Sequence, residues 1–312
     1  RAAAEEADRI AAIAAGLDED ARAAVAREDA RLAEEQGRPN TPEALATLPR
    51  LSLGDVPADN PELPVTRRRH GDATVLRTDV LSPGVSHVTL AFDLAGLDPD
   101  LVDYLPLYAD ALTRLGAGDR GWEELARAQD LVMGPPDAHS ACSALVGDPD
   151  RAGFHLALSA SALHRSVGDM LAMLDVRVRA LRLDEHDRLA ELVHERRAQL
   201  RNGVIPGGSA YAGRYARRGL SRAHAIGERT GGFSQIRFFE ALDDHLDRDL
   251  DRVVDALAAI RAHVAERAGL TVSLVGDDAA ADAVDGFAAG YATRGGVAAI
   301  DNALAAPAVR HE

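Results

Sequence analysis

The chain has 312 residues and a formal net charge of −15 at pH 7, and 46% of its residues are hydrophobic. This content suffices for a core, which excludes a wholly disordered chain, and the length allows one large domain or two smaller ones. All 35 basic residues are arginine. The acidic balance argues against nucleic acid as the main partner, because phosphate binding needs a clustered positive field.

The sequence carries no targeting or membrane signal. No run of about 18 apolar residues occurs, so a membrane span is not expected, and residues 1–9 lack the apolar segment of a signal peptide. The single cysteine, Cys142, excludes an intrachain disulfide and fits a reducing compartment. It lies in an apolar alternation, which favours a buried, inert thiol. We therefore expect a bacterial cytoplasmic protein, and the missing initial methionine indicates a part of a longer one.

Residues 1–36 are predicted to form a helical hairpin. Ile10 and Ile13 mark a weak apolar stripe, Gly16 can end the first helix, and Asp18 can cap the second. Residues 37–64 are rich in proline and glycine, which predicts an extended connector. The predicted organisation is a hairpin and linker over 1–64, an α+β domain over 65–295, and the start of a connection to a following domain over 296–312.

Alternating apolar and polar residues predict the strands of the second domain. The alternation is clearest over 88–94 and 154–160, and segments 73–78, 139–146 and 270–275 are similar. Such alternation is typical of a mostly antiparallel sheet that is covered on one side. The run Arg67–His70 precedes the first of these strands and is interpreted as a solvated edge rather than a phosphate site.

Helices are predicted over 163–181, over 184–202 with Asp184 as cap, and over 246–264 with Gly269 beyond its end. The segment 206–212 is interpreted as a turn that opens a helix with Ser209 as cap. The fold class is α+β, a mostly antiparallel sheet packed against long helices and preceded by a helical hairpin linker. Strands and helices do not alternate regularly, which argues against a doubly wound nucleotide-binding fold.

Zinc peptidase motifs are missing from the chain. HExxH and HxxEH need two histidines and a glutamate on one helical face. His194-Glu195 is followed by Arg196, Arg197 and Ala198, so HExxH fails at its last position. The inverted spacing at 182–186 has Arg182 where its first histidine must stand, and a guanidinium cannot ligate zinc. No catalytic, cofactor-binding or metal-ligating residue is predicted, although His87, His139 and His155 lie on strands and could meet in a suitable register.

Four segments together resemble the second half of presequence-protease-type enzymes, a branch of the insulinase/pitrilysin zinc metallopeptidases. They are LPRLSLGDVP at 48–57, LPLYADALTRLGAG at 105–118, SAYA at 209–212 and GGFSQIRFF at 231–239. The resemblance implies a four-domain enzyme whose two bowl-shaped halves enclose peptides in a chamber, with the hairpin as the linker between the halves. It therefore describes this chain as the linker and third domain.

The resemblance also implies where the chemistry lies. In that family the first domain carries HxxEH on an early helix and a distant glutamate ligand, whereas the equivalent helix here, Tyr104–Tyr108, offers no ligand or base. The family's catalytic Arg and Tyr are expected beyond this chain, and Arg214-Tyr215 is not in their context. Zinc is thus expected in the parent enzyme and not on this chain, which alone is predicted inactive. The implied partners are an N-terminal catalytic half carrying HxxEH, on the same or a separate chain, and peptide substrates.

Two other interpretations stay open. The chain could be a stand-alone non-catalytic binding or scaffold subunit that pairs with a separate active peptidase half. A weaker alternative is an unrelated α+β enzyme that uses the strand histidines.

Overall fold

The computed structural model describes residues 2–59, 63–145 and 148–292. The chain divides into two compact units, Arg1–Pro61 and Glu62–Glu312. The predicted connection over 296–312 lies outside the described residues.

The first unit contains the two predicted helices, α1 (Ala2–Gly16) and α2 (Glu19–Gly37). Asp18 caps α2, because its carboxylate accepts a 2.8 Å hydrogen bond from the backbone N–H of Ala21. The connector is not extended throughout, which corrects the prediction. Thr41 caps a short helix, α3 (Pro42–Ala46), whose first residue is a proline, and a 3₁₀ turn, η1 (Leu53–Asp55), follows.

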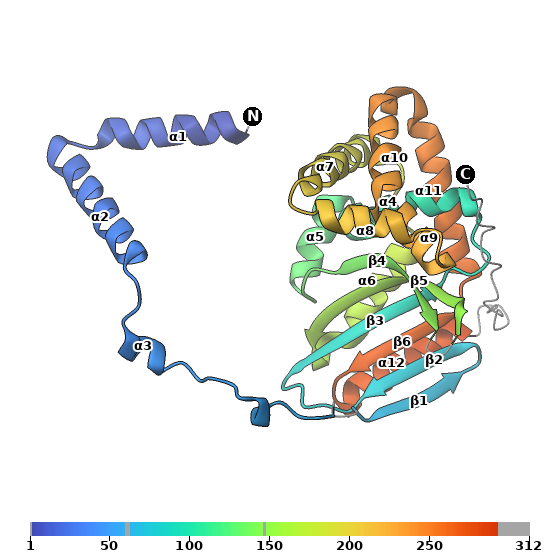
Figure 1. Cartoon of the computed structure of the whole chain (residues 1–312). Helices are drawn as coiled ribbons and strands as arrows, with labels where there is room; N and C mark the ends of the chain where they lie inside the picture. Colours follow the sequence, from blue (N-terminus) through green and yellow to red (C-terminus); the bar gives the residue numbers. More distant parts are fainter. Residues whose placement is uncertain (1, 60–62, 146–147, 293–312) are drawn as a thin grey trace. The chain divides into compact units, whose positions relative to one another are not determined.

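The second unit is built on one six-stranded sheet (Figure 1). The strands, in spatial order, are β1 (Val65–His70), β2 (Ala73–Thr78), β6 (Leu270–Val275), β3 (Val85–Asp93), β5 (Asp148–Leu163) and β4 (Asp137–Leu145). β2 and β6 run parallel, and the other four pairs are antiparallel. The mostly antiparallel sheet predicted from the alternation is confirmed.

The arginine run forms the edge strand β1 instead of preceding the first strand, which corrects the prediction. Its residues pair antiparallel with β2, so that Arg68 faces Val75. Most of β1 is exposed and polar on both faces, so it shows no period-2 apolar signal. Asp285 holds this edge, because its carboxylate pairs with Arg68 and lies 3.0 Å from Nε2 of His70.

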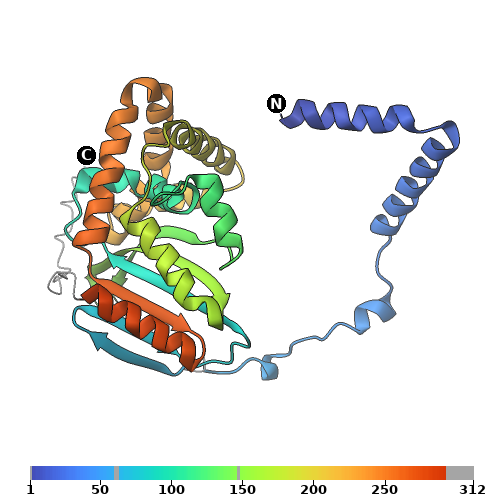
Figure 2. The same ribbon diagram turned by 180° about the vertical axis from the view of Figure 1, so that it is seen from behind.

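Helices cover one face of the sheet. Figure 2 shows α6 (Val167–Arg179) and α12 (Asp278–Ala292) lying across it. The ring of Phe92 on β3 lies 6.3 Å from that of Tyr291 on α12, and the buried strand residues Leu90, Val272 and Leu274 belong to the same core. The opposite face of the sheet, termed the uncovered face, is the one seen in Figure 1.

The remaining helices gather at one end of the sheet (Figure 1). They are η2 (Pro99–Tyr104), α4 (Leu105–Arg114), α5 (Trp122–Asp130), α7 (His186–Val204), α8 (Gly208–Arg217), α9 (Arg222–Gly231), α10 (Phe233–Asp244) and α11 (Leu246–Glu266). The 3₁₀ turn η3 (His164–Ser166) joins β5 to α6 near the start of β3. The predicted α+β class is confirmed. Among the described residues, none of the helices combines the length and apolar content needed to cross a bilayer.

Two predicted helix caps were wrong. Glu185 precedes α7, while the carboxylate of Asp184 accepts a 2.8 Å hydrogen bond from Arg182 instead. α8 begins at Gly208, so Ser209 lies inside its first turn, and no side chain caps that helix. Residue preference for the cap position does not predict either outcome. In the first case the nearby Arg182 binds the aspartate, and in the second a flexible glycine pair lets the helix begin before Ser209.

Candidate functional surface

Short polar side chains line the uncovered face of the sheet. Nδ1 of His87 on β3 lies 2.7 Å from Oγ of Ser161 on β5, and the hydroxyls of Thr89 and Ser159 lie 2.9 Å apart. These residues occupy the polar phase of strands whose other phase is buried in the core. Neutral groups that partner one another across β3 and β5 make the middle of this face wettable, while Arg67 and Arg69 lie on the same face at its β1 edge.

The three strand histidines do not converge. His87 faces Ser161, which lies six residues from His155 along β5, or about 20 Å at the rise of an extended strand. His139 faces Ala157 on β5, two residues from His155 and on the same side of the strand. Burial and the neighbouring His139 lower the pKa of His155. Among the described residues, no three His, Cys, Asp or Glu side chains are grouped so as to hold a metal ion.

The near-motif residues on α7 are engaged in other contacts. Glu195 forms an ion pair with Arg114 of α4, and His194 contacts the carboxylate of Asp243 on α10. His186 is exposed at the start of α7. These partners leave the His194-Glu195 pair without the geometry of a zinc helix.

Helix α4 is the one that the resemblance equates with the catalytic helix. Its early residues Leu105, Leu107 and Tyr108 are fully buried. In the 104–108 alignment, the positions of the HxxEH motif are held by Tyr104, Leu107 and Tyr108, which are all buried. If the glutamate is aligned with Asp110 instead, histidines are required at Leu107 and Ala111, both of which are 0% exposed and apolar. The residues present therefore do not fit a zinc ion on α4.

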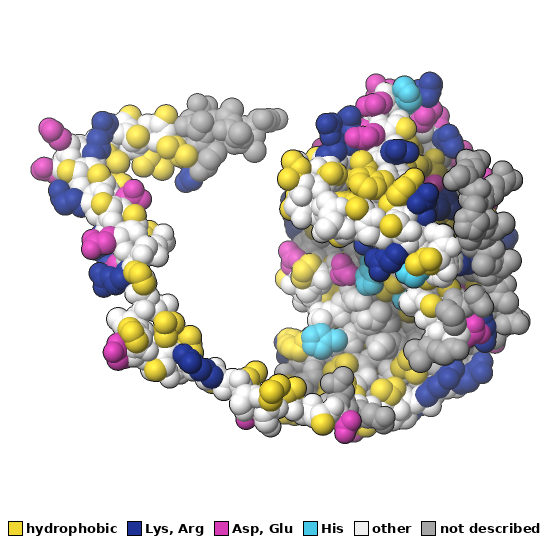
Figure 3. All heavy atoms as spheres, in the orientation of Figure 1, with side chains coloured by type: hydrophobic (Ala, Val, Ile, Leu, Met, Phe, Trp, Pro, Cys, Tyr) yellow, Lys and Arg dark blue, Asp and Glu magenta, His cyan; other side chains and the backbone are white. Residues whose placement is uncertain are grey.

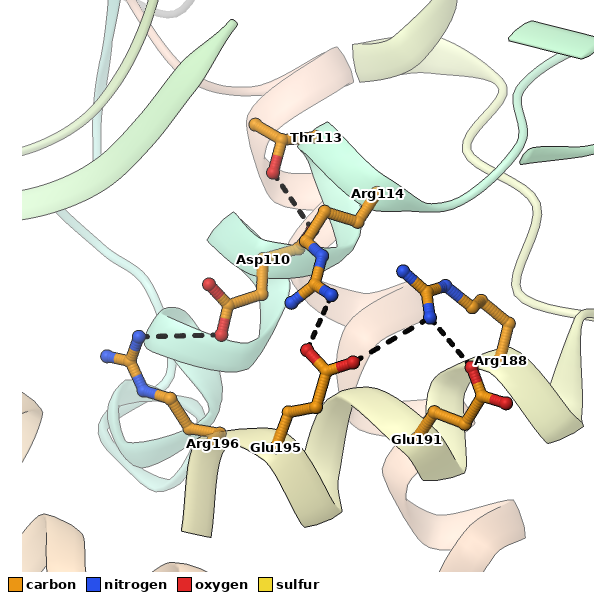
Figure 4. A network of polar contacts seen from close by, with 7 residues as sticks. All are labelled: Asp110, Thr113, Arg114, Arg188, Glu191, Glu195 and Arg196. Carbon is orange, nitrogen blue, oxygen red and sulfur yellow. Dashed lines mark hydrogen bonds and ion pairs between the residues drawn. The ribbon is translucent and has the colours of Figure 1, made fainter. Parts of the chain in front are cut away.

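Figure 4 shows a network of ion pairs between α4 and α7 that sequence reasoning missed. Asp110 lies 3.4 Å from Arg196, and Arg188 lies 2.7 Å from Glu191 and 3.8 Å from Glu195. Burial raises the pKa of Asp110, while Arg196 and Arg114 oppose that shift. Asp110 and Glu195 join α4 to α7, Glu191 pairs within α7, and each of the three carboxylates already has a cationic partner.

Cys142 lies on β4 and is partly buried against the core. Burial raises the pKa of its thiol, which disfavours the reactive thiolate. This environment agrees with the prediction of an inert thiol.

Arg214 and Tyr215 both lie on α8. The guanidinium of Arg214 donates to the carbonyl of Gly231, at the end of α9. Tyr215 is partly exposed, and the guanidinium of Arg218 lies 3.7 Å from the centre of its ring. Arg214 thus serves a helix–helix contact and Tyr215 a cation–π contact.

Comparison with known proteins agrees with the resemblance drawn from the sequence. A family model for the region associated with peptidases of family M16, subfamily C, matches residues 1–242. Presequence protease 1, chloroplastic/mitochondrial, of Arabidopsis thaliana is 24% identical over 273 residues, which cover 88% of this chain and 25% of that protein. The mitochondrial presequence protease of Danio rerio is 25% identical over 225 residues, which cover 72% and 22%.

A crystal structure of a conserved protein from Enterococcus faecalis V583 shares the fold, with a TM-score of 0.53 at 9% identity over 73% of this chain and 52% of that one. The chain spans about a quarter of the length of the curated relatives it matches. The resemblance to presequence proteases drawn from the sequence is confirmed, and the chain belongs to the family of regions associated with subfamily C of the M16 peptidases.

Proposed function

We propose that this chain is a non-catalytic part of a zinc metalloendopeptidase, forming the linker and one wall of a closed chamber in which peptides are degraded. The observation that carries the proposal is the uncovered face of the sheet, where hydroxyl and imidazole groups pair across strands in a protein related to presequence proteases. A wall of this kind presents hydrogen-bonding groups to an extended peptide without binding it tightly. Its contribution is confinement, which selects substrates by size and by extended conformation.

The chemistry is assigned to an N-terminal half that carries HxxEH and zinc, on the same polypeptide or on a separate subunit. Leu107, Ala111 and the ion-paired Glu195 of this chain do not fit a zinc site, so no catalytic step is assigned to its residues. Closure of the two halves would complete the site. The lone partly buried thiol supports a reducing compartment, and we place the enzyme in the bacterial cytoplasm.

The test is an assembly experiment. The chain and the catalytic half are purified together and apart, and cleavage of quenched fluorescent peptides of increasing length is measured. We expect that only the assembly cleaves the peptides and that folded proteins resist cleavage.

Ser159→Trp, which places a bulky ring on the uncovered face, should lower kcat/KM for long peptides more than for short ones. Asp169→Trp, on the exposed surface of α6 across the sheet, should not. Chelator-sensitive cleavage by this chain alone would refute the proposal.

The alternative of a separate scaffold subunit is favoured by one observation. Ile10, Ile13, Val25 and Leu32 on α1 and α2 are between 46% and 59% exposed, which is typical of helices that complete their packing on a partner. Size-exclusion chromatography with and without the neighbouring gene product separates the two cases. Association of two independently encoded chains would favour the scaffold, and a single open reading frame that encodes both halves would favour the linker.

A further inference from the structure

Residues 196–227, termed the cationic segment, reverse the charge of the molecule locally. The segment contains seven arginines and no aspartate or glutamate, within a chain of net charge −15. It runs from the second half of α7 through α8 into α9. A cluster of positive side chains in a protein whose net charge is negative indicates a site for an anionic ligand.

The segment separates into a paired part and an unpaired part. Arg196, Arg197 and Arg201 on α7 lie 3.4, 3.2 and 3.9 Å from carboxylates of Asp110, Asp244 and Glu240. In the part of the chain that the structure describes, no carboxylate lies within ion-pair distance of the other four, which are Arg214, Arg217, Arg218 and Arg222. Arg217 and Arg218 donate only to backbone carbonyls of their own helix, at 3.1 and 2.8 Å.

The unpaired part is accessible. Helix α8 has no buried residue, and Tyr215 and Leu220 beside the arginines are 41% and 73% exposed. The Arg218 guanidinium already lies against the Tyr215 ring, so little side-chain entropy remains to be lost when it binds. Exposed tyrosine and arginine together are typical of residues that anchor protein ligands.

The position of α8 relates it to the uncovered face. Figure 1 shows α8 and α9 on the side from which that face is seen, at the end of the sheet where α9 contacts β4 and β5. Figure 3 shows the surface recessed below these helices, with their side chains at its rim. A peptide that lies along the uncovered face would therefore pass the cationic segment.

We propose that the cationic segment binds acidic stretches of peptides. The inference rests on the proposed function, because it takes the ligand to be a peptide that reaches the uncovered face. Guanidinium groups bind carboxylates through paired, charge-assisted hydrogen bonds. An anionic membrane fits less well, since α8 lacks the wide apolar face that immersion requires. A long polyanion would extend over the acidic rest of the chain and be repelled by it. A short peptide interacts only with charges within a Debye length of about 8 Å, because salt screens the more distant ones.

The test measures binding to the whole 312-residue chain by fluorescence anisotropy. The probes are a fluorescein-labelled peptide rich in Glu and versions of it in which each Glu is Gln or Lys. The variant is R217Q/R218Q, which breaks no contact between helices. The matched control is R252Q/R267Q, in α11 and just after its end, which removes two exposed arginines that also lack a carboxylate within ion-pair distance among the described residues. Circular dichroism confirms that each variant is folded.

We expect the Glu peptide to bind tightest, in a salt-dependent manner. R217Q/R218Q should weaken it about fivefold, as expected for two exposed ion pairs, and the control should change it less than about twofold. R217E/R218E should shift the preference to the Lys peptide. Equal binding of the Glu and Gln peptides, equal weakening by both double variants, or tighter binding of anionic vesicles or single-stranded DNA would overturn the inference. This readout needs no cleavage, so its failure differs from failure of the assembly experiment.

Discussion

Nη2 of Arg177 on α6 donates a 2.7 Å hydrogen bond to Oε1 of Gln129 on α5, and Nη1 donates a 3.0 Å bond to the carbonyl of Leu112 on α4. Arg177 is 1% exposed, and no carboxylate pairs with it in the described ranges. Burial lowers its pKa to about 10, so the side chain keeps its charge at neutral pH. One buried cation thus joins three helices through neutral acceptors.

Gln129→Leu is expected to destabilise the fold by about 2–3 kcal/mol, because it leaves the buried Arg177 charge with one acceptor fewer. The double variant Arg177→Met/Gln129→Leu should cost less, since it removes the desolvated charge together with its side-chain partner. Urea unfolding monitored by fluorescence of Trp122 and by circular dichroism measures both. Gln199→Leu on the exposed surface of α7 is the control and should stay within about 0.5 kcal/mol. A neutral Gln129→Leu would show that the cation is solvated in another way.

The turn after α4 leaves no room for a side chain at Gly116. A Cβ there would lie 2.4 Å from the carbonyl oxygen of Arg120 and 2.8 Å from Oε1 of Glu185, whose carboxylate accepts hydrogen bonds from the backbone N–H groups of Gly116 and Trp122. Gly116→Ala should destabilise the domain by roughly 1–3 kcal/mol through this overlap.

Gly168 provides the comparison for that substitution. It lies in α6, and a Cβ there would meet nothing within 4 Å. Gly168→Ala should therefore be neutral or stabilising by up to about 1 kcal/mol, because alanine favours the helix. The thermal unfolding midpoints of the two variants test this difference. A similar decrease of the midpoint in both variants would contradict the close contact at Gly116.

The strands that the sequence predicted best are those with one buried face. Segments 73–78 and 270–275 coincide with β2 and β6, because alternation there is enforced by burial in the core. β1 was missed because its edge position lets both of its faces stay polar. The parallel pairing of β2 with β6 joins residues almost 200 positions apart, as in Val75 with Val272, and no local pattern encodes it.

From the sequence, the candidate functional surface could be predicted only in those features that depend on which residue types are present at fixed spacing. The missing histidines of α4 are visible in the sequence because a zinc helix has fixed ligand spacing. The contact between Asp110 and Arg196 joins residues 86 positions apart, and no local sequence pattern around either residue predicts it. The arginines of the cationic segment could have been found by scanning charge along the chain, but which of them lack carboxylate partners depends on how α7 meets α4 and α10.

Acid should destabilise the domain partly through His155. Burial lowers its folded pKa below the ordinary value, an effect that His139 reinforces and Asp93 opposes, so the unfolded state binds the proton more readily. Its neutral form therefore favours folding above pH 6.5, and this contribution is lost as the pH falls through 6.5 toward the lowered folded value. His155→Gln should reduce the fall in urea midpoint between about pH 7.5 and 5.5, whereas exposed His186→Asn should not. An unchanged pH dependence in His155→Gln would refute this assignment.

Metal removal should leave the isolated chain unaffected. Leu107 and Ala111 occupy the positions on α4 where a zinc helix needs imidazoles, and Glu195 on α7 is paired with Arg114. Binding of a metal to the folded state would raise the thermal midpoint in proportion to the logarithm of metal concentration. We expect the same midpoint with added zinc and with a chelator, and substoichiometric zinc by elemental analysis of the purified chain. Stoichiometric zinc that depends on His139 and His155 would instead favour a metal site on the uncovered face, because those are the two strand histidines that the sheet brings near each other.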